Sequence, residues 1–202
     1  MYIKLINETP TPYTLRQLRQ DNPNVSFPKE PAEGTLARYD VYSVTYSDRP
    51  SYNPIKETLK EVYEQVDGLW YRNWVIEQRP AEEAKALFAQ HVNAYRDERI
   101  LGGFDYMGHT FDSDANAQKR ISAATLLAVI SNGAPGDYRW HGGDTDFVWI
   151  TQDNQQVPMD APQMIMFGKT AAEWERKNIF AARALKDMDP IPDNWKDEAF
   201  WA

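Results

Sequence analysis

Short extended and helical segments alternate through the first half of the N-terminal region. Apolar and polar side chains alternate from Tyr2 to Ile6, which predicts a strand. We expect residues 9–12 to end that strand, because they contain two prolines and proline cannot donate to a β ladder. Leucines at helical spacing predict a short amphipathic helix over residues 13–20. A second short helix is expected over residues 31–38, since proline and acidic residues stand near its start.

Residues 54–80 carry two conflicting patterns. Four aliphatic side chains recur at intervals of four, three and four, the spacing of one helix face. These side chains are Ile55, Leu59, Val62 and Val66. Against the helix, Asp67-Gly68 is a dipeptide favoured in two-residue hairpin turns, and the aromatic and β-branched residues from 69 to 76 suit a strand. We therefore predict a β-hairpin.

A longer helix is predicted after this hairpin. Pro80 and the acidic pair Glu82-Glu83 suit its first turn, and Gly102-Gly103 suits its end. Its side chains trace a largely apolar stripe at helical spacing, which indicates a face that packs against other elements. The stripe consists of Ala84, Leu87, Phe88, His91, Val92 and Tyr95.

The remainder of the chain predicts two hairpins and two helices. Residues 104–111 predict a short hairpin. A helix that is capped near Ser113 and ends at Asn132-Gly133 follows it. A second hairpin is expected from strands at 147–151 and 155–158 around the turn residues Asp153-Asn154. Asp160 and Pro162 then begin a long helix to about Met188, with Gly168 as a candidate break.

These elements predict an α+β fold without internal repeats or heptads. A small N-terminal α+β region with a β-hairpin is followed by a compact domain of short antiparallel strands and two main helices. We place an N-terminal domain at 1–80, a connecting helix at 81–102, a C-terminal domain at 103–190 and a tryptophan-containing tail at 191–202. The missing repeats and heptads argue against a solenoid or a coiled-coil shaft.

Composition narrows the classes of partner. The formal net charge of -8 and the absence of clustered basic residues argue against nucleic acid, whose affinity depends on Lys and Arg. Cysteine is absent, which removes disulfides, thiolate metal sites and cysteine nucleophiles. No segment approaches the roughly 20 apolar residues that span a bilayer, and no signal peptide is recognisable, so we expect no membrane insertion and synthesis in a cytoplasm. The 7 Trp, 11 Tyr and 8 Phe fit either a small aromatic core or a contact surface.

Candidate metal ligands are few. His91, His109 and His141 fall in different predicted elements and show no short ligand spacing. Residues 112–116 resemble the start of a calcium loop, but Ala117 replaces its glycine and Ala123 its bidentate glutamate. A helix N-cap explains the Asp and Ser residues there, and a solvated loop explains the acidic residues at 142–146.

Candidate catalytic motifs are equally incomplete. Gly168-Lys-Thr170 lacks the upstream glycine of a phosphate-binding loop, and Gly102-Gly103 lacks the rest of one. Glu82-Glu83 is explained by the helix dipole, and no nucleophile, base and orienting group can be assembled. We predict no catalytic, cofactor-binding or metal-binding residue, and no enzymatic activity.

Several sequence segments of the N-terminal region resemble segments of known proteins. They are Tyr2-Ile-Lys-Leu-Ile-Asn7, Pro12-Tyr-Thr-Leu-Arg-Gln-Leu18, Asn22-Pro-Asn-Val-Ser-Phe-Pro28, residues 36–39, Val66-Asp-Gly-Leu-Trp70 and Trp74-Val75. In this order they resemble the start of small bacteriophage tail proteins.

A second set of segments lies in the C-terminal half. They are Gly103-Phe-Asp-Tyr-Met-Gly-His-Thr-Phe-Asp112, the Ala-rich segment 121–127, Trp149-Ile-Thr-Gln-Asp-Asn154, Val157-Pro-Met159 and Phe180-Ala-Ala-Arg-Ala-Leu185. Together they resemble an uncharacterised domain that is commonly encoded beside phage tail-fibre genes. That domain has no assigned activity or cofactor to carry over.

The two resemblances imply a structural component of a bacteriophage tail, in the baseplate, the tail tip or a fibre-attachment connector. Its expected partners are other tail proteins of the fibre, baseplate or hub, and its expected location is the virion after synthesis in the bacterial host cytoplasm. Because tails are symmetric, we expect a homo-oligomer or several copies on a ring. A tail-fibre assembly chaperone that leaves the virion is the alternative, and a tail-tip hydrolase would need a carboxylate pair that the sequence does not offer.

Overall fold

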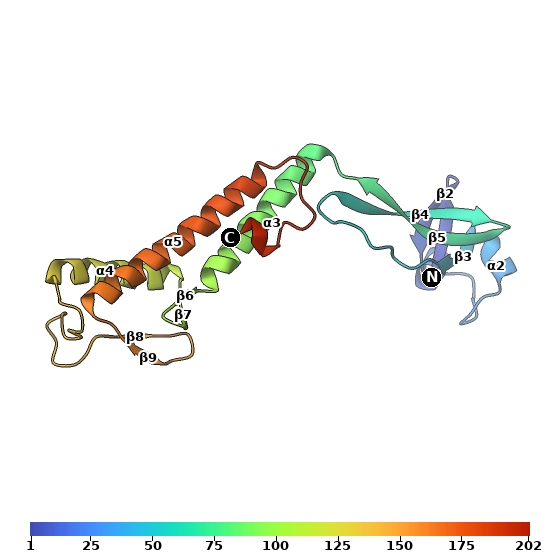
Figure 1. Ribbon diagram of the computed structural model, residues 1–202. Coiled ribbons are helices and arrows are strands. Elements are labelled where there is room, and N and C mark those ends of the chain that lie inside the picture. Colours follow the sequence, from blue (N-terminus) through green and yellow to red (C-terminus); the bar gives the residue numbers. More distant parts are fainter. The chain divides into compact units, whose positions relative to one another are not determined.

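The chain forms two compact units. The computed structural model describes residues 1–202 and divides between Met1–Ala84 and Lys85–Ala202, inside the first turn of helix α3 (Ala81–Leu101). Each unit combines helices and strands, which confirms the predicted α+β fold class (Figure 1). The observed division lies close to the expected boundary at 80, but α3 belongs almost entirely to the second unit instead of standing apart as a connector.

A five-stranded mixed sheet forms the first unit. The strands lie in the order β2-β1-β3-β5-β4, with β3 parallel to β5 and every other pair antiparallel. Two short helices accompany the sheet. The elements are β1 (Tyr2–Ile6), β2 (Thr9–Tyr13), α1 (Leu15–Asp21), α2 (Glu33–Ala37), β3 (Val41–Tyr46), β4 (Glu57–Val66) and β5 (Leu69–Gln78).

Strand β2 corrects one prediction from the sequence. Residues 9–12, expected to end the first strand because proline cannot continue a ladder, pair with β1 through a two-residue turn in which Asn7 and Glu8 have φ of 49° and 64°. Pro10 and Pro12 are tolerated because β2 is the edge strand. Hydrogen-bonded pairs alternate along an antiparallel ladder, so prolines two positions apart can both stand where an N–H would face solvent.

Both short helices expected in this region are present, and they close its small core. The Thr14 side chain caps α1 by accepting a hydrogen bond from the backbone N–H of Gln17 at 3.2 Å. One leucine from each helix is almost fully buried against the sheet. The core consists of Tyr13, Leu18, Leu36 and Val41, with Tyr2, Leu15, Phe27 and Tyr39 packed around it.

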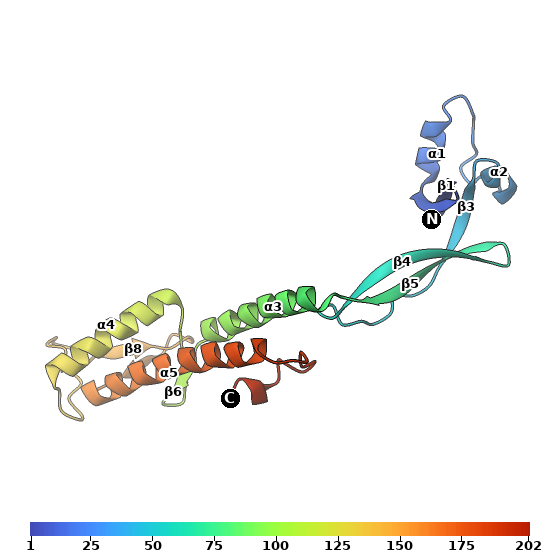
Figure 2. The same cartoon turned by 90° about the horizontal axis from the view of Figure 1, so that it is seen from above.

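The hairpin prediction for residues 54–80 is confirmed. Asp67 and Gly68 form the turn with φ of 50° and 81°, and the flanking strands β4 and β5 pair along their full ten residues. Strand β3 pairs with β5 at only three positions, from Val44 opposite Trp70 to Tyr46 opposite Arg72. The rest of the hairpin is therefore a two-stranded ribbon, and Figure 2 shows its strong twist.

The second unit contains three long helices and two small hairpins. In both views α4 and α5 lie side by side (Figures 1 and 2). None of the helices is long and apolar enough to cross a bilayer. The elements after α3 are β6 (Phe104–Tyr106), β7 (His109–Phe111), α4 (Ala115–Ser131), β8 (Val148–Ile150), β9 (Gln156–Pro158), α5 (Ala161–Lys186) and the short 3₁₀ helix η1 (Glu198–Phe200).

The core of this unit lies between the hairpins and the α4–α5 pair. Phe167 contacts the rings of Phe104, Phe111 and Trp149, so one α5 side chain joins both hairpins. Both hairpins and both helices were expected from the sequence, and these predictions are confirmed. The buried residues are Phe104, Phe111, Ile121, Ala128, Trp140, Val157, Met159, Ala161, Met164, Phe167 and Ala171.

Helix α5 runs unbroken through Gly168, so the candidate break there is wrong. Gly168 instead allows α5 to pack closely against α4. A Cβ at this position would stand 3.0 Å from the Cβ and 2.9 Å from the Cγ2 of Thr125 on α4. The two helices cross closely at this point, and only glycine leaves room for the threonine.

The C-terminal segment packs onto α3 instead of forming a separate tail. The Trp195 ring meets Phe88 and Tyr95 edge-on, with centroids 5.7 Å and 5.5 Å apart. The Trp201 ring meets Tyr95 at 5.1 Å, and Trp201 is fully buried. Residues 191–202, which we separated by sequence, therefore belong to the second unit because their tryptophans complete its aromatic packing.

The Gly168→Ala variant tests the close helix crossing. Helix propensity alone would stabilise the protein by about 1 kcal/mol. We expect instead a net loss of about 1–2 kcal/mol in the free energy of unfolding, because the new methyl group overpacks the contact with Thr125. Chemical denaturation of both single variants and the double variant with Thr125→Ala measures the coupling. A stabilised Gly168→Ala protein, or purely additive effects, would contradict the crossing.

Candidate functional site

The three histidines lie apart in the second unit. His91 is exposed on α3, His109 lies in β7, and His141 lies in a loop beside the rings of Trp140 and Phe147, at centroid distances of 5.8 Å and 5.5 Å. Nowhere in residues 1–202 do three His, Asp or Glu side chains group in a way that could hold a metal ion. The histidines therefore define no ligand set.

The segment that resembled a calcium loop caps helix α4. The Asp114 carboxylate accepts hydrogen bonds from the backbone N–H groups of Ala117 at 2.9 Å and Asn116 at 2.7 Å. These two bonds lower the pKa of Asp114 below its ordinary value. The cap interpretation is confirmed, one residue later than the Ser113 position that we expected. Ser113 instead accepts a hydrogen bond from Gln118 at 2.8 Å.

The remaining sequence motifs have local structural roles. Gly168-Lys-Thr170 lies inside α5, where backbone N–H groups are used by the helix and cannot bind a phosphate. Asp146 in the glycine-rich loop pairs with Arg139 at 3.4 Å, and both are well exposed. Glu83 in the first turn of α3 pairs with Arg79 at 3.8 Å. The structure brings none of these candidates together.

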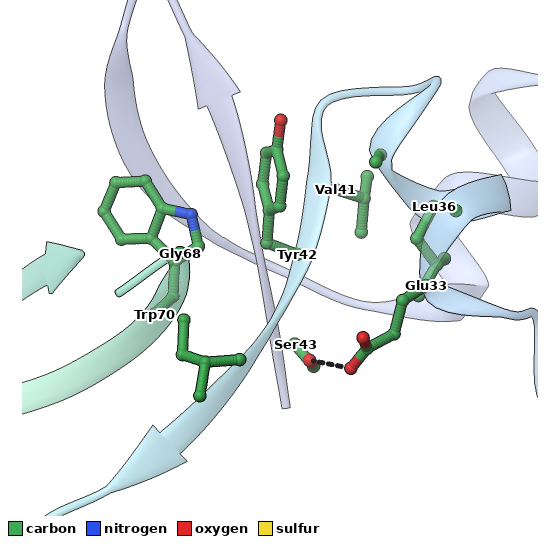
Figure 3. Close-up of a pocket in the computed structure, with 10 residues that line it drawn as sticks. Glu33, Leu36, Val41, Tyr42, Ser43, Gly68 and Trp70 are labelled. Atoms are coloured by element: carbon green, nitrogen blue, oxygen red, sulfur yellow. Dashed lines mark hydrogen bonds between the residues drawn. The ribbon is translucent and has the colours of Figure 1, made fainter. Parts of the chain in front are cut away.

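A pocket opens in the first unit where β3 and the start of β5 diverge (Figure 3). Its volume is about 250 Å³, below the roughly 300–1,000 Å³ typical of small-molecule sites. Glu33 of α2 accepts a hydrogen bond from the Ser43 hydroxyl at 3.1 Å, and the Trp70 indole N–H is buried without an acceptor. Leu36 and Leu69 add apolar walls. A single carboxylate that is already hydrogen-bonded supplies no acid–base pair.

Aromatic and cationic side chains alternate on the β4–β5 ribbon. Arg72 lies over the rings of Tyr46 and Trp74, with its guanidinium carbon 4.3 Å and 5.1 Å from the two centroids. Arg49 lies over Trp74 and Tyr52 at 5.6 Å and 5.4 Å. Such contacts contribute about 0.5–1 kcal/mol each at exposed sites. They hold the loop that carries Arg49 and Tyr52 against the ribbon.

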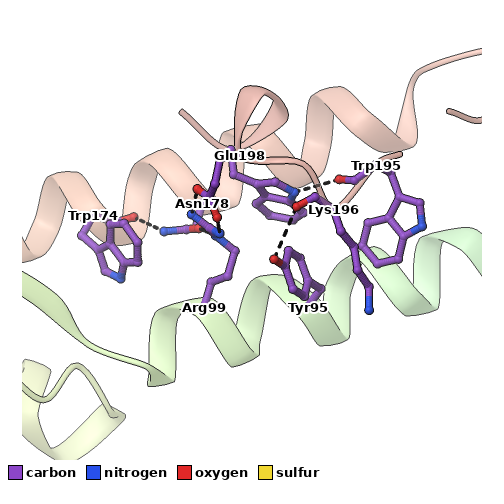
Figure 4. A network of polar contacts seen from close by, with 8 residues as sticks. Tyr95, Arg99, Trp174, Asn178, Trp195, Lys196 and Glu198 are labelled. Atoms are coloured by element: carbon purple, nitrogen blue, oxygen red, sulfur yellow. Dashed lines mark hydrogen bonds and ion pairs between the residues drawn. The ribbon is translucent and has the colours of Figure 1, made fainter. Parts of the chain in front are cut away.

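A polar network ties the C-terminal segment to α3 and α5 (Figure 4). Arg99 on α3 donates to both carboxylate oxygens of Glu198, one of them at 2.9 Å, and its Nε donates to Asn178 at 2.9 Å. Asn178 is completely buried in α5 and donates to the Trp174 carbonyl at 2.9 Å. Arg99 thus joins α3 both to α5 and to the C-terminal segment.

The outward face of α4 is apolar and exposed. Four large aliphatic side chains there are exposed by 61%, 45%, 55% and 71%, in chain order Leu126, Leu127, Val129 and Ile130. The opposite face of the same two turns is apolar as well and packs into the core through Ala124 and Ala128. A helix that is apolar all round is normally buried all round, so this outward face is a candidate contact surface.

The sequence analysis named no binding residue and so missed this face. A signal was present, because Thr125 is the only polar residue between positions 123 and 130. Its hydroxyl donates to the Ile121 carbonyl at 2.7 Å, which removes even that polar group from the surface. Which half of the helix faces solvent could not be read from a pattern that is apolar in every direction.

The fold and surface are those of a two-unit α+β protein with an exposed apolar helix face. Residues 83–199 match the family model described as a domain of unknown function (DUF4376). The match spans more than half of the chain and coincides closely with the second unit, and the protein belongs to this family. No curated protein and no solved structure matches the chain.

Acidification should loosen the C-terminal segment. The hydrogen bond from Arg99 lowers the pKa of Glu198 below its usual value of 4.5. A carboxylate with a lowered folded-state pKa stabilises the fold above the unfolded pKa and loses that effect as pH falls through the folded pKa. We therefore expect the Trp201 indole N–H, which donates to the Trp195 carbonyl at 2.9 Å, to exchange faster as pH falls below 4.5.

Two comparisons make this prediction specific. The indole N–H of Trp140 donates to the Met159 carbonyl at 2.8 Å in the core of the same unit and serves as the internal reference in an NMR exchange series. In Glu198→Gln the acid-dependent difference between the two indoles should disappear, because the variant cannot titrate. Equal exchange of both indoles at every pH in the unsubstituted protein would contradict a role for the ion pair.

Proposed function

We propose that the protein is a structural component of a bacteriophage tail, in the baseplate, tip or fibre-attachment region, and that it acts by contact with other proteins. The observation that carries the contact role is the outward face of α4, with Leu126, Leu127, Val129 and Ile130 exposed. The tail location is supported by the resemblance of both halves of the chain to proteins encoded in tail regions.

The energetics of this face favour a bound state. Burying a Val, Leu or Ile side chain completely stabilises a complex by about 1.5–3 kcal/mol. Four such side chains, each about half exposed or more, represent several kcal/mol that the isolated chain leaves unused. Helix formation alone does not require these aliphatic residues, since Lys, Gln or Glu have equal or better helix propensity. A contact with another protein accounts for them.

The ribbon of the first unit offers a second surface for contact. Val66, Leu69, Val75 and Ile76 of this hairpin are exposed by 50%, 52%, 41% and 41%. Strand β4 is also an edge strand of ten residues, with backbone groups on one side that no strand satisfies. Long exposed edges readily accept another strand. Both units thus present surfaces suited to assembly.

Mass spectrometry of purified phage particles tests the proposal. We expect the protein in mature virions, at a copy number that fits the symmetry of the tail. A tail-fibre assembly chaperone would use the same apolar face but would be absent from mature particles while being required for infectivity. That result would overturn the virion role and establish the alternative.

A charged substitution on α4 should block incorporation. We expect Ile130→Lys to lower the amount of the protein in particles at least tenfold, because the outward face would then have to bury an ammonium group. Ile179→Lys on α5 is the matched control, since Ile179 is also exposed, by 43%, and lies outside α4. Equal incorporation of both variants, with unchanged circular dichroism, would show that the α4 face is not used.

A further inference from the structure

We propose that the pocket of the first unit binds an extended segment of another protein, which adds beside β3 and places a lysine side chain next to Glu33. This site goes beyond the contact role proposed for α4, because it lies in the other unit and has its own partner chemistry. Three features of the first unit support it: the free edge of β3, the different chemistry of its two faces, and the charge of the pocket.

The edge of β3 beside the pocket has no strand opposite it. The Asp40 carbonyl, just before β3, accepts a backbone hydrogen bond from Leu5 of β1 at 2.9 Å. Hydrogen-bonded residues alternate along an antiparallel ladder, so Val41 and Ser43 direct their backbone polar groups away from β1. Strand β5 meets β3 only from Val44 onward. The preceding stretch of β3 therefore presents a free strand edge, to which an extended segment can add.

The two faces of this edge differ in chemistry (Figure 3). Val41 and Ser43 point to the face that α2 covers, and Glu33 of α2 belongs to the same face because it accepts the hydrogen bond from Ser43. Tyr42 points to the opposite face, where its ring centroid lies 6.1 Å from that of Trp70. Successive residues of an added segment therefore meet a carboxylate on one face and two aromatic rings on the other.

Glu33 makes lysine the preferred side chain on the first of these faces. Its carboxylate lines the pocket and forms no ion pair within the protein, and one of its oxygens is held by the Ser43 hydroxyl at 3.1 Å. An ammonium group needs only the other oxygen, whereas an arginine fork binds best to both. Leu36 and Leu69 offer apolar walls for the aliphatic stem of lysine. A volume of about 250 Å³ suits one side chain better than a whole small molecule.

A short peptide tests the site on the full chain. The probe is acetyl-Val-Lys-Val-amide, whose β-branched residues favour an extended backbone. We expect a titration to about 10 mM to shift the NMR signal of the Trp70 indole N–H, which lies buried at the pocket without an acceptor. The indole signal of Trp140, in the core of the second unit, should stay fixed. Norleucine in place of the peptide's lysine should abolish the shift, because the charge is removed and the stem is kept.

Methylation of the peptide's backbone nitrogens should also abolish the shift, because strand addition needs their hydrogen bonds. Two variants of the protein then locate the charge. Glu33→Gln keeps an amide oxygen for the Ser43 hydroxyl but removes the charge, and we expect it to weaken binding about fivefold. Glu30→Gln is the matched control, since Glu30 is exposed, precedes α2 and lies outside the pocket. It should leave the affinity unchanged.

Four results would overturn the proposal. They are the absence of a Trp70 shift at the highest peptide concentration, equal binding of the norleucine or the methylated peptide, an equal effect of the two glutamate variants, and an equal shift with n-butylamine. The last result would show a site for free amines instead of an extended segment. All of these measurements use the isolated protein, so they are independent of whether the chain is found in phage particles.

Discussion

The close crossing of α4 and α5 at Gly168 determines which face of α4 is buried. Because Thr125 fills the space left by the glycine, α4 turns Ile121, Ala124 and Ala128 toward the core. A helix that is apolar all round cannot bury both faces against one neighbour, so the opposite side is left to solvent. The packing of the core and the exposure of the contact face are thus two consequences of one approach between helices.

The first unit depends on a different constraint, the short overlap between β3 and β5. Three paired positions join the ten-residue strands of the hairpin to the small sheet and its helices. A two-stranded ribbon has no hydrophobic layer of its own and is only marginally stable alone. Stacking of Arg72 and Arg49 on the neighbouring aromatic rings compensates in part. The same arrangement leaves apolar side chains on the ribbon exposed to solvent.

The polar network around Arg99 stabilises the second unit by joining the C-terminal segment to α3 and α5. Arg99 satisfies Glu198 and Asn178 at once, and the tryptophans of the C-terminal segment complete the packing on α3. The network and the aromatic packing together fix the C-terminal segment on α3 and α5.

The sequence by itself determined most elements, because hydrophobic spacing, turn dipeptides and caps act locally. It predicted the Asp67-Gly68 hairpin against a competing helical pattern, and the capping role of the residues before α4. Only the tertiary structure decided the pairing of the proline-containing strand β2, the continuity of α5 through Gly168, the docking of the C-terminal tryptophans and the outward face of α4. The last three depend on residues far apart in the chain, such as Gly168 and Thr125, whose proximity no local pattern encodes. The pairing of β2 is local, but its tolerance of two prolines depends on its place at the edge of the sheet.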